Sequence, residues 1–306
     1  MSLVVEELVA AQRSAAADAI LRTASAAYDG PIIVLKGPSA AAYYPQPVLR
    51  PFTDLDILVE DAAGAQRALV AAGFEPVGPY GDGYYDGLHH RRPLHRHAQD
   101  PLLVEVHARP NWVEWVDAPD VRELFSVAVP GPAGIDGVLT LPAPQMALVL
   151  AAHSWLEAPL RRLLDLVDVA AIVADADRGE LDELARRWGL AKMARTTLAA
   201  ADALAYGDSQ PWSLRLWARD LAPVRDPSVL DTHLRSWLSP FWALPAHRAI
   251  AATITALGRD LTPAPSETWR RKLDRTRGAV LHPGRSEAEH RQLLGPENAH
   301  PRLDRH

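Results

Sequence analysis

The 306-residue chain contains no cysteine, which excludes disulfide bonds, cysteine–zinc sites and cysteine nucleophiles. No apolar run reaches about 18 residues without charged side chains, and the first residues lack the basic and apolar segments of a secretion signal. The spaced glycines of P-loop and Rossmann phosphate-binding motifs are also absent. We therefore expect a soluble cytoplasmic protein with no membrane partner.

Excess positive charge is absent too, because the formal net charge is −6 at pH 7. This charge argues against a general nucleic-acid-binding protein. A basic segment at residues 89–97 nevertheless leaves binding of a tRNA end open. The hydrophobic content of 48% is ordinary for a globular protein, and the length is sufficient for a large core and two domains.

The sequence changes character near residue 140. Before this point, short β-branched runs predict strands, and longer amphipathic stretches predict helices. The strands are expected at residues 32–35, 56–59, 74–77 and 102–107, with an edge strand within 89–97. The helices are expected at residues 5–28, 39–44, 60–72 and 112–125, the last introduced by Pro110-Asn111 and interrupted by Pro119. After residue 140, apolar residues recur every three or four positions, which predicts a helical bundle.

These patterns predict an α+β fold in three parts. Residues 1–140 are expected to form a small mixed sheet with flanking helices, including the N-terminal helix at 5–28. Residues 141–280 are expected to form a helical domain. Residues 281–306 are rich in proline, arginine, glutamate and histidine and are expected to be a flexible tail.

Asp54 and Asp56 are the first candidates for chemistry. Residues two apart in a strand face the same side, so both carboxylates can converge while Leu55 and Ile57 face the core. A charge at the start of an apolar strand is costly unless it is paired or bound to a metal. The alternative is a solvated turn, because an Asp-x-Asp triplet also arises by chance, as at residues 175–177.

Glu105 supports the metal hypothesis because it interrupts an apolar run at residues 102–107. A metal ion bound jointly by Glu105 and by Asp54 and Asp56 on a neighbouring strand would compensate the negative charge of Glu105. Three carboxylates form the hard oxygen site that Mg²⁺ prefers. The alternative is an edge-strand glutamate that points to solvent.

The turn after the first strand is a candidate phosphate site. Gly37 permits close backbone approach, and the N–H groups of the following turn, which includes Ser39, can hold phosphate oxygens. Lys36 would supply a counter-charge to the phosphates, or it is simply an exposed residue at a strand end. Arg50, four residues before Asp54, would brace the loop or contact a phosphate, and an ordinary surface arginine is the alternative.

Five of the twelve histidines lie between residues 89 and 107. Three interpretations of this cluster are open: the wall of an active site, a solvated basic hairpin, and a histidine–carboxylate site for a transition metal. His153 lies in an apolar helical segment, as a hydrogen-bonded core residue or as a partner of Asp165 and Asp168. Trp112 and Trp155 would frame an acceptor pocket or fill the core.

The order of these features resembles a known family. A strand ending in Lys36-Gly37 precedes a helix, an arginine and the run Asp54-Leu55-Asp56-Ile57-Leu58-Val59. Then follow Gly73-Phe74, His89-His90, Val104-Glu105-Val106-His107, His153 and the run Arg161-Arg162-Leu163-Leu164-Asp165-Leu166. Over roughly residues 30–280, this order is similar to the branch described as uncharacterised nucleotidyltransferases, within the DNA polymerase beta-like superfamily.

The resemblance implies transfer of a nucleoside monophosphate from a nucleoside triphosphate to a hydroxyl group. It implies Mg²⁺, or Mn²⁺ in its place, bound by Asp54, Asp56 and Glu105, with Glu105 also able to act as general base. The residues expected to contact the nucleotide are Lys36, Gly37, Ser39 and Arg50. The chain departs from the family at the Gly-Ser turn, where Pro38 is inserted. The residues expected in the substrate wall are His90, His107 and His153.

The acceptor is open between a small metabolite, an antibiotic and a hydroxyl on a modified peptide. The resemblance implies a place in peptide natural-product gene clusters, where members of this branch often occur. One alternative is transfer of another group, such as a sugar from a nucleotide sugar. The other alternative is a non-catalytic, antitoxin-like nucleotide sensor, which the departure at the Gly-Ser turn supports.

Overall fold

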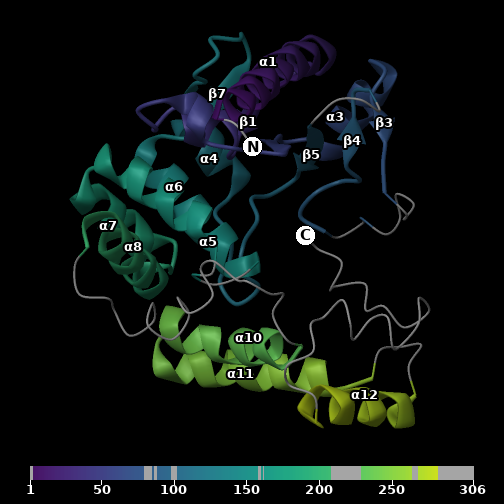
Figure 1. The fold of residues 1–306 in the computed structure, drawn as a ribbon, viewed down its shortest axis with the longest axis vertical. Helices are drawn as coiled ribbons and strands as arrows, with labels where there is room; N and C mark the ends of the chain where they lie inside the picture. Colours follow the sequence, from purple (N-terminus) through teal and green to yellow (C-terminus); the bar gives the residue numbers. More distant parts are fainter. Residues whose placement is uncertain are drawn as a thin grey trace.

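The structure is a computed structural model that describes residues 3–78, 85, 88–97, 102–157, 160, 162–207, 229–263 and 268–281. A mixed sheet lies between helices, and further helices follow towards the C-terminus (Figure 1). This arrangement confirms the predicted α+β fold. Among the described helices, none is both long and apolar enough to cross a membrane.

The seven described strands form one sheet in the order β3-β4-β5-β2-β1-β7-β6. Their bounds are β1 (Ile32–Val34), β2 (Asp54–Leu58), β3 (Glu75–Pro76), β4 (Leu94–His95), β5 (Leu103–His107), β6 (Val129–Pro130) and β7 (Val138–Thr140). At its centre, β2 pairs in parallel with β5 on one side and antiparallel with β1 on the other. The acidic strands β2 and β5 are therefore direct neighbours.

Helices α1 (Leu3–Ala27) and α3 (Ala62–Ala71) cover one face of the sheet (Figure 1). Their apolar side chains share a buried cluster with Ile32, Val34, Leu55 and Ile57. Because side chains alternate along a strand, the remaining side chains of β1 and β2 project to the opposite face. This alternation directs Asp54 and Asp56 away from α1 and α3.

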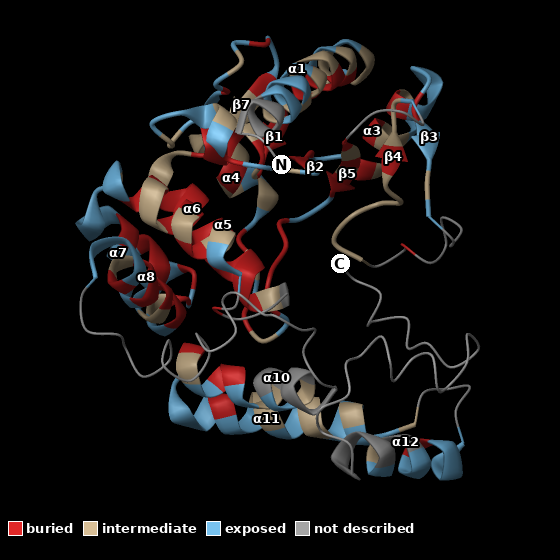
Figure 2. Cartoon of the chain, in the orientation of Figure 1, coloured by how far each residue is buried: buried red, intermediate tan, exposed pale blue. Residues whose placement is uncertain are grey.

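The opposite face is covered by α5 (Ala143–Glu157) and α6 (Leu163–Ala174), with Ile33 and Leu58 in the buried cluster they share. The short helices α2 (Pro38–Ala41) and α4 (Val121–Val127) also lie on this side, whereas η1 (Pro47–Leu49) contacts α1 and α2. Helices α7 (Arg178–Arg187) and α8 (Ala191–Tyr206) pack against α5. Figure 2 shows buried residues concentrated in the sheet and in α5, α6 and α8.

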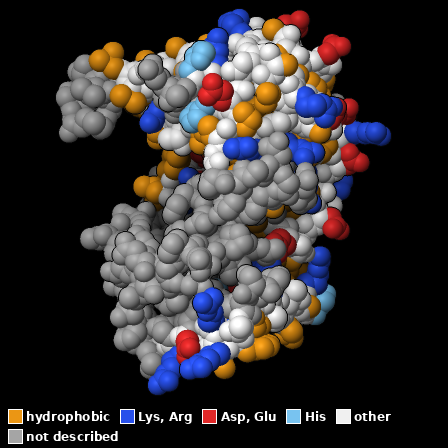
Figure 3. Space-filling model, turned by 90° about the vertical axis from the view of Figure 1, so that its right-hand side faces the viewer, with side chains coloured by type: hydrophobic (Ala, Val, Ile, Leu, Met, Phe, Trp, Pro, Cys, Tyr) orange, Lys and Arg blue, Asp and Glu red, His pale blue; other side chains and the backbone are white. Residues whose placement is uncertain are grey.

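The helices α10 (Val229–Ala243), α11 (Ala246–Leu261) and α12 (Trp269–Leu281) lie at the end of the molecule away from the sheet (Figure 1). α10 packs on α11 and α8. Basic and hydrophobic side chains are exposed together at this end (Figure 3), including Ile254, Trp269 and Leu273. This region is less buried than the rest of the described chain.

The structure corrects two details of the predicted elements. The helix expected at 112–125 is wrong before residue 120, because Pro119 precedes Asp120, whose side chain caps α4 by accepting from the backbone N–H of Arg122. Strands β6 and β7 were not predicted, because they are too short for a periodic signal. The division at 140/141 stays a prediction, and residues 282–306 of the expected tail lie outside the described residues.

Candidate active site

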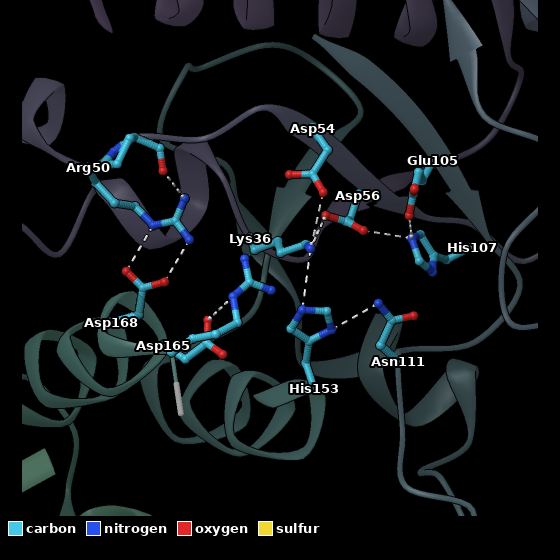
Figure 4. A network of polar contacts seen from close by, with 12 residues as sticks. Lys36, Arg50, Asp54, Asp56, Glu105, His107, Asn111, His153, Asp165 and Asp168 are labelled. Atoms are coloured by element: carbon cyan, nitrogen blue, oxygen red, sulfur yellow. Dashed lines mark hydrogen bonds and ion pairs between the residues drawn. The ribbon is translucent and has the colours of Figure 1, made fainter. Parts of the chain in front are cut away.

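The parallel register of β2 and β5 sets the geometry of the acidic site. Asp56 lies opposite Glu105, and Leu58 lies opposite His107. Asp54, Asp56, Glu105 and His107 therefore project from the same face of the sheet, and their side chains lie together in Figure 4. This is the arrangement of three acids on adjacent strands that the sequence predicts, although the catalytic and metal-binding roles stay predictions.

Lys36 follows β1 and places its ammonium group beside both aspartates. Its Nζ is 3.4 Å from Asp54 Oδ2 and 3.0 Å from Asp56 Oδ2. The lysine side chain is only 15% exposed, so it is part of the site and does not extend into solvent at the strand end. In the described structure, Lys36 thus neutralises part of the acidic charge.

His107 is fully buried and lies between two carboxylates. Its Nε2 is 2.8 Å from Asp56 Oδ1 and 3.6 Å from Glu105 Oε2. Burial alone would lower the pKa of His107, but the hydrogen bonds to Asp56 and Glu105 raise it to about 9. His107 therefore contacts metal-candidate carboxylates directly, whereas the resemblance favours a contact with substrate or phosphate.

The two aspartates have opposite pKa shifts. Burial and the neighbouring charge of Asp56 raise the pKa of Asp54. Burial would also raise the pKa of Asp56, but Lys36 and His107 outweigh it and hold that pKa well below the usual range. Asp56 is consequently the permanently charged member of the pair, and Asp54 is the member that takes up a proton first.

The donor set fits a hard divalent cation. Asp56 Oδ2 is buried and accepts no hydrogen bond of normal geometry from the described residues, although it is ion-paired with Lys36. Asp56, Glu105 and His107 each offer a ligand atom, and these atoms lie within 4.8 Å of one another. Asp54 adds a fourth donor, the third oxygen, on the same face. Oxygen donors suit Mg²⁺ and Mn²⁺, whereas His107, whose raised pKa favours the protonated ring, would have to lose a proton to act as a ligand.

His153 on α5 contacts Lys36 on the side of the ammonium group that faces away from the aspartates. Its Nε2 is 3.4 Å from Lys36 Nζ, and its Nδ1 is 2.9 Å from Asn111 Nδ2. His153 is buried, and it does not pair with Asp165 or Asp168 in any hydrogen bond described. The sequence reasoning missed Asn111, which had no signal beyond its place at the start of an expected helix.

Arg50 and Asp168 form a buried ion pair near the acidic site. Arg50 donates from Nε to Asp168 Oδ1 at 2.9 Å and from its terminal nitrogen to Oδ2 at 2.6 Å. Tyr44 donates its hydroxyl to the same Asp168 Oδ1 at 2.6 Å. Asp168 thereby ties the loop before β2 to α6, which supports the bracing role for Arg50. Its phosphate-binding role stays a prediction.

A pocket of about 230 Å³ lies between the acidic site and this ion pair. Lys36, Asp54 and His153 line one side, and Arg50 and Asp168 line another. The rest of the lining consists of Pro51, Phe52, Thr53, Leu150, Arg162, Leu164 and Asp165. The pocket therefore combines apolar walls with charged groups of both signs next to the candidate metal ligands.

The predicted phosphate turn has the backbone that the sequence requires. Gly37 has a φ of +61°, and a Cβ there would lie 3.5 Å from the carbonyl oxygen of Asp54. The positive φ is the reason for glycine here, because a Cβ at that distance would make only an ordinary contact. Ser39 is buried in α2, and its hydroxyl has no hydrogen-bond partner among the described residues. The phosphate contacts of Gly37 and Ser39 stay predictions.

His90 lies near the acidic site but does not contact the acids in any interaction described. It forms a bridge to His107 in the sheet, and its Nδ1 is 2.7 Å from the carbonyl oxygen of Arg91. The rings of His89 and His107 stack with centroids 5.6 Å apart. The histidine cluster therefore borders the site at β5, and a substrate contact of His90 stays a prediction.

The two tryptophans are buried in the core. Trp155 donates its indole N–H to Thr197 at 2.7 Å, and Trp112 packs edge-on against Trp188. Neither lines the pocket beside Lys36. Of the two alternatives for these residues, the structure supports the core.

Comparison with known proteins assigns the family. Residues 5–205, more than half of the chain, match the family described as uncharacterised nucleotidyltransferase. No curated protein and no solved structure matches the chain. The match includes every residue of the site described above, from Lys36 to Asp168.

Proposed function

The chain belongs to the uncharacterised nucleotidyltransferase family, and we propose that it transfers a nucleoside monophosphate from a nucleoside triphosphate to a hydroxyl group in a magnesium-dependent reaction. The observation that carries this proposal is the register of β2 and β5, which places Asp56 opposite Glu105 and Asp54 on the same face. Within the wider DNA polymerase beta-like superfamily, to which we also assign the chain, this is the expected place for metal-binding acids.

The proposed cation ligands are Asp54, Asp56 and Glu105. When bound, Mg²⁺ or Mn²⁺ would neutralise triphosphate charge and lower the pKa of an attacking hydroxyl. The acids are available for this role because Lys36 and His107 balance only part of their charge in the described structure. The other residues of the site would bind the substrates and orient them.

The pocket beside Asp54 would receive part of the nucleotide. Lys36 and Arg162 are the lining cations that we assign to phosphate oxygens. In the described structure, Lys36 pairs with Asp54 and Asp56, and Arg162 pairs with Asp165. Arg50 is held by two hydrogen bonds to Asp168. Phe52 and Leu164 provide apolar surface for a base or sugar. Gly37 would add its backbone N–H and Ser39 its hydroxyl to the phosphate contacts, since the backbone N–H of Ser39 donates to the carbonyl oxygen of Lys36.

Glu105 is the proposed general base. Its side chain is 23% exposed, so it can reach an acceptor that approaches from solvent. The acceptor hydroxyl would give its proton to Glu105 while its oxygen attacks the α-phosphorus, and pyrophosphate would leave in line. We place the acceptor on the β5 side, where His90 and His107 border Glu105. The proposed acceptor is a small molecule or a natural-product peptide in the cytoplasm.

Two experiments test this function. Isothermal titration with ATP, GTP, CTP and UTP should show nucleotide binding that requires Mg²⁺ or Mn²⁺. Incubation with α-labelled nucleotide and candidate acceptors should transfer the label to the acceptor. Asp54→Asn should strongly weaken cation-dependent nucleotide binding, and Asp175→Asn, at an exposed aspartate in a second Asp-x-Asp triplet, is the matched control.

The outcomes separate the alternatives. Failure of the wild type to bind any nucleotide with divalent cation would contradict the proposal. Binding of nucleotide without label transfer to any acceptor would favour a nucleotide sensor. Binding and turnover of a nucleotide sugar, with the sugar transferred, would replace nucleotidyl transfer by glycosyl transfer.

A further inference from the structure

Asn111, His153 and Lys36 form a chain of polar contacts that joins three separate elements (Figure 4). Asn111 lies in the loop after β5, His153 lies on α5, and Lys36 follows β1. The Asn111 amide is 2.9 Å from His153 Nδ1, and His153 Nε2 is 3.4 Å from Lys36 Nζ. Asn111 and His153 are both buried, so the roles of donor and acceptor along this chain must be consistent.

The Lys36 end of the chain fixes the role of His153 Nε2. Two carboxylates lie 3.0 and 3.4 Å from Lys36 Nζ, which keeps the amine as an ammonium ion. An ammonium group has three N–H donors and no lone pair. His153 Nε2 must therefore present its lone pair, because an N–H there would place two donors against each other. A neutral imidazole of this kind carries its proton on Nδ1.

The Asn111 end must then accept that proton. An Nδ1–H group needs an oxygen, whereas the placed amide presents Nδ2 to His153 and leaves Oδ1 buried without a hydrogen-bond partner. Turning the amide by half a rotation exchanges its oxygen and nitrogen, which are assigned from the hydrogen-bond network. In either orientation, only one end of the Asn111 amide, its oxygen or its NH₂ group, faces His153. The oxygen must be that end, because an NH₂ group there would put the histidine proton on Nε2, against the N–H donors of Lys36.

We propose that Asn111 is a positioning residue that sets the tautomer of His153. The amide oxygen of Asn111 accepts the Nδ1–H of His153, and the Nε2 lone pair then accepts from Lys36. This contact holds the ammonium group at the junction of Asp54, Asp56 and the 230 Å³ pocket. The consequence for nucleotide binding rests on the proposed function, but the tautomer does not.

The tautomer can be read directly by NMR. Full-length protein with ¹⁵N-labelled histidine gives ring nitrogen shifts that distinguish protonated from unprotonated nitrogens, and His153→Gln identifies the His153 signals by their loss. We expect Nδ1 to be protonated and Nε2 to be unprotonated in the wild type. Asn111→Leu removes the acceptor while keeping the branching and the number of side-chain heavy atoms, and it should abolish this preference.

Gln145→Met is the matched control. Gln145 is a second buried amide with an unpartnered oxygen, and it lies on the same helix as His153. Its replacement should leave the His153 signals unchanged. A proton on Nε2 in the wild type would overturn the proposal even if Asn111→Leu fails to fold. An unchanged tautomer in a folded Asn111→Leu variant would overturn it as well.

The link to Lys36 has its own readout. Loss of one hydrogen bond to a charged group should weaken binding of ATP with Mn²⁺ about fivefold or more in Asn111→Leu, and Gln145→Met should bind normally. Equal affinity in folded Asn111→Leu would overturn the link to Lys36. If the wild type binds none of ATP, GTP, CTP and UTP with Mn²⁺, the proposed function is overturned together with that link, and the tautomer assignment stands.

Discussion

Two clusters of charged side chains flank the same pocket, and they differ in how their charges are balanced. On one side, Arg50 and Asp168 form a one-to-one pair with two hydrogen bonds, and Tyr44 donates a third to Asp168. On the other side, Lys36 and His107 face three carboxylates. The first cluster is electrostatically complete within the protein, and the second retains acidic groups that can accept a cation.

The difference predicts a structural role for the Arg50–Asp168 pair and is consistent with the cation-binding role proposed for the acidic cluster. A buried pair with satisfied hydrogen bonds fixes the loop before β2 against α6, and removal of either partner leaves an uncompensated charge. A cluster with excess like charge is costly until a cation binds, which is typical of sites retained for function. The following predictions test this contrast, from the largest expected effect to the smallest.

Removal of Asp168 should cause the largest loss of stability. In Asp168→Asn, Arg50 stays buried without its counter-charge, so the free energy of unfolding should fall by about 3–5 kcal/mol. Urea unfolding measures this change, with the exposed Asp175→Asn as control. A fall below about 1 kcal/mol would show that the pair is not structural. Divalent-cation affinity should be retained in the folded fraction.

Removal of Glu105 should affect the reaction and leave the fold intact. Glu105→Gln preserves shape but cannot accept the acceptor proton, so single-turnover label transfer should slow about a hundredfold or more. The free energy of unfolding should change little. Glu75→Gln, at an exposed position in β3, controls for a general effect of the substitution. Retention of the wild-type rate in Glu105→Gln would exclude Glu105 as general base.

Cation binding should weaken on the acid side because of Asp54. Burial and the Asp56 charge raise the pKa of Asp54, so this carboxylate takes up a proton at a higher pH than an ordinary aspartate. Protons then compete with the cation, and Mn²⁺ affinity should fall about tenfold per pH unit below that pKa. Titrations followed by electron paramagnetic resonance measure this. Asp54→Asn should bind Mn²⁺ weakly, and its affinity should not show this loss at low pH. An identical loss in the variant would refute the assignment of the pH dependence to Asp54.

The smallest predicted effect is a gain in stability when Asp54 is neutralised. Because the folded state raises the pKa of Asp54, its charged form opposes folding above that pKa. Asp54→Asn should therefore raise the free energy of unfolding by about 1 kcal/mol at neutral pH without divalent cations. With saturating Mg²⁺, the wild type should instead be more stable than Asp54→Asn, because the cation binds and stabilises the wild type. Destabilisation of the cation-free variant would contradict the excess-charge interpretation.

Much of this arrangement could be predicted from local sequence patterns. The spacing of Asp54 and Asp56 in a short apolar strand required both side chains to share a face, because side chains alternate along a strand. The β-branched runs predicted the central strands, and Lys36-Gly37 predicted a tight turn after the first strand. The resemblance to nucleotidyltransferases rested on the order of these motifs, and the match over residues 5–205 confirms it. The roles of the individual site residues stay predictions.

Contacts between distant segments had no local signal. Arg50 and Asp168 are 118 residues apart, and Asn111 and His153 are 42 apart. Nothing in the sequence near Asp168 distinguishes it from Asp165, which was an equal candidate as a partner for His153. The short strands β6 and β7 were missed because they are too short for a periodic signal, and β7 joins the sheet through the distant strand β1.

The sequence by itself thus determined the chemical types of the site and their local directions: two acids on one strand face, a third acid in another apolar strand, and a lysine at a glycine turn. Only the tertiary structure decided which of these groups meet. The parallel register of β2 and β5 placed Glu105 beside Asp56, and the packing of α5 and α6 on the sheet paired His153 with Lys36 and Asp168 with Arg50. The physical reason is that strand alternation is a property of the local backbone, whereas register and helix packing depend on the burial of the whole core.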